Sequence, residues 1–571
     1  MKRFSEDDKL FGWWRQSVDS FQKWVAEAKI DRYYFENRQW TYAEAAKLGS
    51  VDQPVITINH IYPKVNMLVG LLLQNNPTIH VLPRGREDAE LADVANKTLR
   101  FIADINRLRS KQAYTFTDLT TTGIGWLETR TTQILGKDPI VIDYVPWYEV
   151  IPDPLARMPD YSDSRFIWRG RWVDADICVE FFPQAKKVIG QFSSAPYKGI
   201  TLNMPGATDR EWFDRQRNRV FLVECQYKEF AKTKCFWDGF QAVKYIPSVH
   251  DQSLNLGIGS LLEAKIQVVR QAFILGDFVI ENNELPYLFN NFTLIPFVAY
   301  RDSEGNPIGL VRYLRDMQDE INKRRSKVLH YLTAKRVLAQ KGAVMNPKEF
   351  LDELSRPDAF LEYNKGFDIK IEQDLELGSQ HFQLMQEAAN EISTISGIYP
   401  DFQGMPTNAR TSAAIRQRVM QSQTATQLYF SATEAGLTRL FENCLALARQ
   451  YYTDQRLIQI TDEPYAIVLN EPVPTEDGRL EIRNSLARLR ADIVVTIEPG
   501  GQTARQQQLV QLVELFKALP QEVAAMSLDV LIDAFDIPQK SILKQRFVQI
   551  MQAMMQQQQQ QQQQPPEQNR V

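Results

Sequence analysis

The chain has few of the residues that usually build metal sites or disulfide frameworks. Among its 571 residues there are only four cysteines: Cys178, Cys225, Cys235 and Cys444. Their spacing fits neither a CxxC metal site nor a dense disulfide scaffold. The five histidines are scattered, and no two have the spacing of metal ligands. We therefore expect no bound metal, no disulfides and a reduced, intracellular setting.

The sequence also lacks a long hydrophobic run. The longest, "MLVGLLL" from Met67, is far shorter than the ~20 residues that a membrane-spanning helix needs. The first residues, "MKRFSEDDKLFGWWRQ", carry charges where a signal peptide requires an apolar core. These absences predict a soluble, cytoplasmic protein without membrane contact.

Neither sign of charge is in large excess. The chain has 66 Lys and Arg against 70 Asp and Glu, a net charge of -4. A protein that binds nucleic acid mainly through electrostatic attraction is usually basic. Any contact with nucleic acid is therefore expected to be local or weak.

Common catalytic motifs are missing as well. No G-x-x-x-x-G-K-[ST], HExxH or G-x-S-x-G occurs. The stretch "GIGWLE" from Gly123 has two glycines inside a β pattern, which makes it a better turn than a phosphate loop. Asp153 in "IPDP" could offer a carboxylate to a metal, but its flanking prolines favour a turn. We predict no catalytic residues, no cofactor, no metal and no enzymatic activity.

One long helix pattern stands out in the middle of the chain. "GLVRYLRDMQDEINKRRSKVLHYLTAKRVL", residues 309–338, has no proline and no glycine after its first residue. Steps of three, four and seven connect Leu314, Met317, Ile321 and Val328, which predicts one buried stripe. The same segment is rich in basic residues, among them Lys323, Arg324, Arg325 and Lys327. The question is why a nearly neutral protein has such a basic helix.

The rest of the chain predicts an α+β fold in which helices predominate. Residues 5–48 have a helical stripe of aromatics, which is either an ordinary packing face or a platform that stacks bases. Short β segments follow from Thr120, including a hairpin with a "WDGF" turn. Two more helices are expected at 378–396, ending at Gly397, and from about 409 to 452. The chain ends in a glutamine run at 556–564.

Several stretches, taken in order, resemble the portal (head–tail connector) proteins of tailed bacteriophages, of the short-tailed type. They are "DRYYFENRQW", "PVITINHIYPKVNMLVGLLLQNNPTIHVLP", "DLTTTGIGWLETRTT", "IVIDYVPWYEVIPDP" and "FIWRGRWVDADICVEFFPQ". The resemblance continues through "LIPFVAYRDSEGNPIGLVRYLRDMQDEINKRRSKVLHYLTAKRV", weakens over 339–377 and is poor beyond about 505. No single stretch is diagnostic; their order carries the resemblance.

The resemblance implies a ring, typically of twelve copies, at one vertex of the capsid. Double-stranded DNA passes along its axis during packaging and ejection, and the ring contacts terminase, tail adaptors, and capsid and scaffolding proteins. The protein would belong to the virion, and to the host cytoplasm during assembly. Such rings are structural, which agrees with the missing phosphate loop. Two other readings remain: a nuclease-like enzyme whose carboxylates hold Mg²⁺, and a helical adaptor without DNA contact.

The same resemblance suggests how the chain is divided. The expected parts are an N-terminal helical arm (1–50), an α/β wing (51–305), stem helix 1 (306–338), a clip (339–377), stem helix 2 (378–397), a tunnel loop (398–410), a long helix (411–452), a β return to the wing (453–504), a helical crown (505–545) and a glutamine-rich tail or short barrel helix (546–571).

Three sets of side chains are candidates for function within this division. Expected DNA or channel contacts are Arg410, which ends the tunnel loop, and Arg416 and Arg418 after it, with Lys323, Arg324, Arg325 and Lys327 on stem helix 1. The alternative for the three arginines is an ordinary surface loop with solvated side chains. The alternative for the stem cluster is a solvated face paired with nearby acids. Subunit packing is expected at Leu314, Met317, Ile321 and Val328. Partner docking is expected at Asp352, Glu353 and Asp358 of the acidic clip, unless that acidity serves only solubility.

Overall fold

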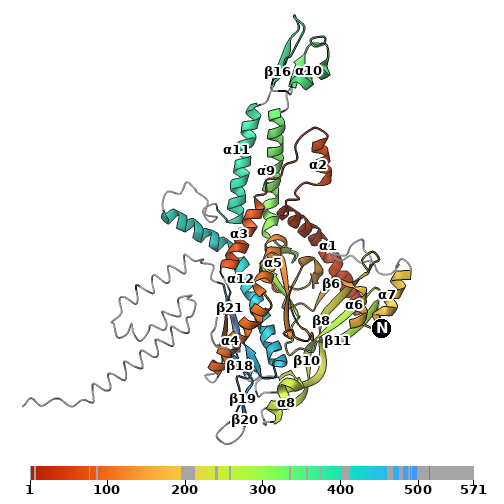
Figure 1. Cartoon of the computed structure of the whole chain (residues 1–571), viewed down its shortest axis with the longest axis vertical. Helices are drawn as coiled ribbons and strands as arrows, with labels where there is room; N and C mark the ends of the chain where they lie inside the picture. Colours follow the sequence, from red (N-terminus) through yellow and green to blue (C-terminus); the bar gives the residue numbers. More distant parts are fainter. Residues whose placement is uncertain are drawn as a thin grey trace, which may run out of the picture.

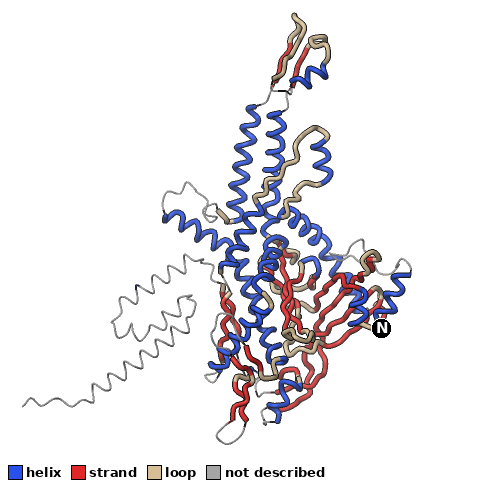
Figure 2. The backbone as a smooth tube through the Cα atoms, viewed as in Figure 1, coloured by secondary structure: helices blue, strands red, loops and turns tan. Residues whose placement is uncertain are grey.

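The computed structural model has a broad, β-rich body from which a long helical hairpin projects, with a small α/β unit at the far end (Figures 1 and 2). Helices make up about 46% and strands about 27%, so the α+β class with helices in excess is confirmed. The structure describes residues 2–4, 8–75, 77–84, 88–194, 212–237, 239, 242–255, 257, 259–333, 336–354, 356, 358–372, 375–399, 412–458, 467–474, 480–486, 489, 491–497 and 514. The expected crown and glutamine tail therefore lie outside the described residues, apart from Glu514.

The larger sheet of the body has eight strands, and every neighbouring pair is antiparallel. Its order is β1-β11-β10-β8-β6-β5, and β7 and β9 also pair with β8. The strands are β1 (Lys2–Arg3), β5 (Val150–Pro152), β6 (Phe166–Asp174), β7 (Phe213–Asp214), β8 (Arg219–Trp237), β9 (Ala242–Lys244), β10 (Ser260–Leu275) and β11 (Phe278–Glu284). The hairpin predicted around "WDGF" is present as β8–β9, in which Trp237 pairs with Ala242 and Cys235 with Lys244.

A smaller sheet, in the order β12-β3-β4, packs against α5 (Leu108–Thr122). Its strands are β3 (Ile124–Thr131), β4 (Ile140–Val145) and β12 (Leu294–Val298). Gly123 ends α5 with φ +96°, and a Cβ on Gly125 would lie 2.2 Å from the carbonyl oxygen of Thr115. "GIGWLE" is thus a turn followed by a tightly packed strand, as the sequence favours.

The N-terminal helix α1 (Lys9–Phe35) lays its aromatic stripe on the body. The Asp8 side chain caps the helix by accepting a hydrogen bond from the amide of Leu10 at 3.1 Å. Trp14 packs edge-on against Trp168, with ring centroids 5.1 Å apart, and Trp24 packs against Trp147 at 5.9 Å. Trp14, Phe21 and Trp24 are buried, so the stripe is a packing face, the first of the two alternatives.

The remaining elements of the body complete the core around these sheets. The long helix α12 (Ser412–Tyr451) contacts β12 and β21, and β21 pairs with β2, so segments more than 400 residues apart in the sequence lie side by side. The other elements are α3 (Ile61–Gln74), β2 (Thr78–Pro83), α4 (Ala89–Ile105), α6 (Ala175–Phe181), α7 (Ala185–Ser194), α8 (Pro247–Asn255), β13 (Tyr300–Arg301), β14 (Pro307–Ile308), β17 (Arg456–Ile458), β18 (Ile467–Leu469), β19 (Glu471–Pro474), β20 (Leu480–Arg483) and β21 (Ala491–Thr496).

The projecting hairpin consists of α9 (Leu310–Thr333) and α11 (Leu375–Ser396), which lie side by side (Figure 1). The helix predicted over 309–338 is shorter than expected. Residues 336–339 form β15 (Arg336–Ala339), which pairs with β16 (Ile369–Glu372); α10 (Pro347–Leu354) lies between them. Strand pairing satisfies the backbone groups that a longer helix would otherwise bond. We call residues 336–372 the tip unit.

A buried carboxyl group in the body predicts a pH-dependent contribution to stability. Asp118 on α5 is 2% exposed; it accepts hydrogen bonds from the hydroxyl of Tyr144 at 2.5 Å and from Arg32 at 3.2 Å. Burial raises the pKa of Asp118 to about 6, although Tyr144 and Arg32 act in the opposite direction. Between about pH 4 and pH 6, Asp118 is therefore protonated in the folded chain, whereas in the unfolded chain it has already lost its proton near the ordinary pKa of 3.8.

Asp118→Asn should remove this pH dependence. The stabilisation from the protonated carboxyl is complete below about pH 4 and is lost as the pH rises to about 6, at up to about 1.4 kcal/mol per pH unit. Thermal unfolding midpoints from pH 4 to 7 should therefore fall for the native chain relative to Asp118→Asn.

Asp143→Asn is the matched control for this experiment. Burial favours a higher pKa for Asp143, but Arg130 and Lys111 bring that pKa below its ordinary value. Its contribution therefore has the opposite sign, being present at neutral pH and lost on acidification. If the thermal unfolding midpoints of the native chain and of Asp118→Asn changed equally with pH, the raised pKa of Asp118 would be contradicted.

Candidate functional site

The apolar stripe of α9 is buried within a single chain. Leu314 is 0% and Ile321 1% exposed, Val328 is also buried, and Met317 is half-buried against the core. The facing helix α11 contributes Ala388 and Ile392, which are both buried. The stripe was expected to be buried by another helix or by another subunit. Within the single chain, α11 and the body bury it, and packing against a neighbouring subunit stays a prediction.

Much of the positive charge of α9 is paired with acids of the same chain. The Nε atom of Arg312 donates to Asp31 on α1 at 2.8 Å. Arg315 donates to Glu27 at 2.5 Å, and its Nε lies 3.3 Å from Asp31. The hydrogen bond from Arg315 lowers the pKa of Glu27, whereas burial raises the pKa of Asp31, which is fully buried. The basic character of the helix is thus explained in part by its packing against α1.

The predicted channel cluster on α9 is also largely engaged. Lys323 lies 3.1 Å from Asp319 and 3.5 Å from Glu44. Arg324 donates to Glu320 at 2.6 Å and contacts Nδ1 of His381 on α11 at 3.1 Å. Within the single chain, Lys323 and Arg324 therefore pair with nearby acids, as the alternative prediction for this cluster has it.

The other two members of the cluster are placed differently. Lys327 is exposed and lies over the ring of Tyr331, 5.6 Å from its centroid. Arg325 is half-buried. Contact of any of the four with DNA stays a prediction.

A second face of α9 carries buried polar side chains that the sequence analysis missed. Gln318, Asn322 and Ser326 are at most 1% exposed and lie at steps of four. Gln318 accepts from the amide of His60 at 2.8 Å and donates to the carbonyl of Ile58 at 2.7 Å. Asn322 accepts from the amide of Ile58 at 3.0 Å, and Ser326 accepts from Gln53 at 3.1 Å. This polar ladder holds the extended segment 53–60 along the helix.

The base of the hairpin is closed by a lysine that the sequence analysis also missed. Lys64 on α3 is 5% exposed; its ammonium donates to the carbonyl of Ile398 at 2.5 Å and to the hydroxyl of Ser393 at 3.1 Å. Burial lowers the pKa of Lys64 to about 8. Gly397, with φ +66°, ends the helical segment as predicted. Lys64 therefore anchors the chain where the predicted tunnel loop begins.

The tunnel candidates themselves are only partly placed. Arg410 lies outside the described residues, as does most of the loop 398–410. Arg416 and Arg418 fall within α12, in a part for which the structure describes the helix but not the side chains. Their contact with DNA stays a prediction.

The tip unit exposes the predicted docking residues together with apolar side chains. Asp352 and Asp358 are exposed, and Glu353 is half-buried and bridges to Arg356 at 2.9 Å. Large apolar side chains are exposed nearby in the sequence, with Met345 at 93%, Phe360 at 78% and Tyr363 at 62%. The sequence pattern pointed only to the acids. The tip unit therefore offers a mixed surface suited to a protein partner.

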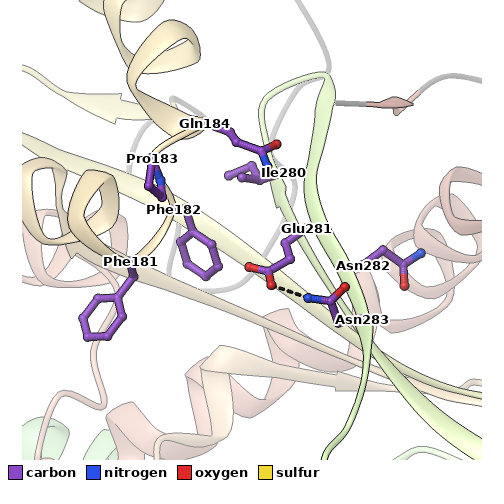
Figure 3. Close-up of a pocket in the computed structure, with 8 residues that line it drawn as sticks. All are labelled: Phe181, Phe182, Pro183, Gln184, Ile280, Glu281, Asn282 and Asn283. Atoms are coloured by element: carbon purple, nitrogen blue, oxygen red, sulfur yellow. Dashed lines mark hydrogen bonds between the residues drawn. The ribbon is translucent and has the colours of Figure 1, made fainter.

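No cluster of candidate metal ligands forms among the described residues. In the part of the chain that the structure describes, no three His, Cys, Asp or Glu side chains lie close enough together to hold a metal ion. Asp153 accepts two hydrogen bonds from the side chain of Arg165, at 2.8 and 3.1 Å, and caps the turn after β5. A pocket of about 450 Å³ lies between Phe181–Gln184 and Ile280–Asn283, where the side-chain amide of Asn283 donates a hydrogen bond to Glu281 (Figure 3). Glu281 is the one ionisable side chain among its eight lining residues, so the pocket brings no acid–base pair together.

Comparison with known proteins identifies the family. The model of the phage P22-like portal protein family matches residues 11–571. The chain belongs to the P22-like portal family. It is also 24% identical over 179 residues to the portal protein of Helicobacter pylori bacteriophage KHP30. That match spans 29% of each chain.

Portal proteins are structural components of virions, so the portal chain is not an enzyme and the nuclease-like alternative is excluded. A further similarity, to a chain of the virion of a native gene transfer agent particle, has 10% identity and a TM-score of 0.33. It covers 82% of this chain and 88% of that one. Among the described residues, none of the helices is long and apolar enough to cross a membrane.

Proposed function

We propose that this portal protein forms a ring, typically of twelve copies, at one capsid vertex. The ring conducts double-stranded DNA during packaging and ejection. The observation that carries this proposal is the family match over residues 11–571. The elongated shape supports it, because the α9–α11 hairpin and its tip unit extend away from the body as a stalk (Figure 1).

The charge balance of the chain also suits a conduit. A sleeve with about 6–10 phosphate contacts would bind DNA strongly at low salt. A net charge of -4 argues against such a sleeve. Rotational symmetry repeats every side chain around the axis, so one arginine per subunit becomes a ring of positive charge. Sparse contacts of this kind can guide DNA without holding it.

The arginines after the tunnel loop are the proposed DNA contacts. Replacing Arg410, Arg416 and Arg418 by glutamine should leave rings intact and change DNA handling by at least severalfold, because each ring loses three charges per subunit. The measurement is the amount of nuclease-protected DNA per capsid, together with the rate of ejection. As the control, Arg217, Lys232 and Lys265 at exposed positions of the wing are replaced by glutamine, which removes the same charge. This variant should change neither the amount of protected DNA nor the rate of ejection. Unchanged DNA handling in the first variant would place the contact elsewhere.

The tip unit is the proposed docking surface for terminase and tail adaptors. Lysine at Asp352, Glu353 and Asp358 should weaken terminase binding about tenfold or more, since like charges then face a partner selected for the opposite sign. Ring formation should be unaffected. Binding is measured with purified rings, and Glu180→Lys on the exposed side of α6 serves as the control. Native affinity in the triple variant would show that terminase binds another surface.

The test of the whole proposal is genetic and biochemical. Without this chain, capsids should contain no nuclease-protected DNA, and a tagged copy should label one vertex per particle. The adaptor alternative predicts instead that capsids fill normally and that only the attachment of tails fails. Full capsids in the absence of the chain would therefore overturn the proposed role in packaging.

A further inference from the structure

The two helices of the stalk are joined to the body in different ways. At the base of α9 the backbone itself is packed tightly, because a Cβ on Gly309 would lie 2.2 Å from the carbonyl oxygen of Thr121. The indole of Trp24 donates a hydrogen bond to the carbonyl of Pro307 at 2.7 Å, and two arginines of α9 contact Asp31. Close backbone contacts and charge pairs therefore fix this end of the hairpin.

The base of α11 is held to the body by fewer polar contacts. The described side chains of residues 380–399 form no salt bridge. The end of the helix is closed mostly by its own groups, since the amide of Ile398 donates to the hydroxyl of Ser396 at 3.2 Å. Among the described residues, Lys64 of α3 is the one side chain of the body that donates hydrogen bonds to this end, to Ile398 and to Ser393 (Figure 1). The contact between α3 and the end of α11 therefore depends on one lysine.

Lys64 is buried without a carboxylate to balance its charge. It is 5% exposed, and none of the described acids forms a salt bridge with it. Burial lowers the pKa of His60, one turn earlier on α3, and the charge of Lys64 lowers it further, so His60 is neutral at alkaline pH. The acids of the neighbouring helices α1, α5, α9 and α11 are bonded elsewhere or exposed: Asp31, Asp118, Asp319, Glu320, Glu387 and Glu391. Burial of an unpaired ammonium costs free energy.

The hydrogen bonds of this site suit a neutral amine at least as well as an ammonium. The site offers two acceptors, the carbonyl of Ile398 and the hydroxyl of Ser393. An ammonium has three N–H donors, one more than the site can accept, whereas a neutral amine has two. In agreement with this geometry, burial lowers the pKa of Lys64 from its ordinary value of 10.5 to about 8. The closed site therefore favours loss of the proton.

We propose that Lys64 makes the base of α11 a proton-coupled joint, in which the closed contact favours the neutral amine and the open contact favours the ammonium. On opening, the amine enters water and takes up a proton, and on closing it returns that proton to the solvent. The base of α9 stays fixed, so one leg of the stalk is released while the other is not. The inference concerns the single chain and goes beyond the proposed ring, on which it does not depend.

Alkaline pH should close this joint. Below about pH 8 Lys64 is charged in both forms, so opening does not depend on pH. Between about pH 8 and 10.5 the open form binds more protons than the closed form, so each pH unit lowers the equilibrium constant for opening by up to about tenfold. A lysine that held α11 only through its positive charge would behave in the opposite way, because loss of the proton would weaken the contact.

Hydrogen exchange of the purified full-length chain, followed by mass spectrometry, tests this joint. Samples at pH 7, 8, 9 and 9.5 are compared after exchange times that are shortened tenfold per pH unit, so that the chemical exchange rate is matched. We expect the opening of residues 392–398 to fall about threefold or more between pH 7 and 9.5. Residues 310–316 at the base of α9 are the internal control, and their matched exchange should not change.

Three variants assign the effect to Lys64. Lys64→Arg stays charged over this range and Lys64→Met is never charged, so residues 392–398 should show no pH dependence in either. Lys29→Met removes an exposed lysine of α1 and should keep the native profile. Opening that is constant or increases with pH in the native chain overturns the proposal, and so does a native profile in Lys64→Met. If a Lys64 variant does not fold, the comparison of the two segments within the native chain decides. An absence of rings would contradict the proposed function and leave this result unchanged.

Discussion

Leu314→Asp is expected to prevent the chain from reaching its native fold. Leu314 is 0% exposed on the face of α9 that α11 and the body cover. An unpaired carboxylate there costs several kcal/mol for its burial, in addition to the lost packing of the leucine. Natural domains are stable by only about 5–15 kcal/mol. We therefore expect insoluble or protease-sensitive protein, and in consequence no rings.

A graded series separates folding from assembly. Leu314→Ala should lower stability by about 2–5 kcal/mol, with the loss visible in the thermal unfolding of the single chain. Tyr313→Asp is the matched control, because Tyr313 is the preceding residue and 48% exposed; it should fold normally. A Leu314→Asp chain that folds with native stability and fails only in ring formation would instead support the original expectation of a subunit contact.

Asp31→Asn is expected to have the second-largest effect. Asp31 is fully buried and contacts both Arg312 and Arg315, so its removal takes away the buried one of the two carboxylates that these partly buried guanidinium groups share. Breaking a buried ion pair by removing one member typically costs about 3–5 kcal/mol. The stalk should detach more readily from α1, which limited proteolysis and hydrogen exchange in 310–316 would detect.

Glu27→Gln provides the control for this variant. Glu27 contacts Arg315, but its side chain is 43% exposed, so water can replace much of what it supplies. The expected loss is at most about 1 kcal/mol. Equal effects of the two substitutions would show that burial does not decide the strength of this cluster.

The sequence predicted the elements whose pattern is local and regular. The steps that connect Leu314, Ile321 and Val328 identified α9 and its buried face, and Gly397 identified the end of α11. The same pattern could not say which partner covers the face, because a stripe is equally apolar against a second helix or a second subunit. It also missed β15, since strand formation at 336–339 depends on pairing with 369–372, 30 to 36 residues away.

Long-range polar contacts were likewise invisible in the sequence. Gln318, Asn322 and Ser326 have the spacing of one helix face, but polar residues at that spacing are usually solvated. Only the structure shows that they hold segment 53–60. Arg312 and Arg315 of α9 posed a related problem, because their acidic partners Glu27 and Asp31 lie almost 300 positions earlier.

The central claim is that this chain assembles into a ring around a DNA-sized channel. Electron microscopy of the purified full-length protein, viewed down the particle axis, tests it most directly. The account predicts closed rings of about a dozen subunits, each with an open centre wider than the roughly 20 Å of duplex DNA, and with the stalks around one end. Monomers or solid particles without a central opening, at concentrations where the chain is folded, would contradict it.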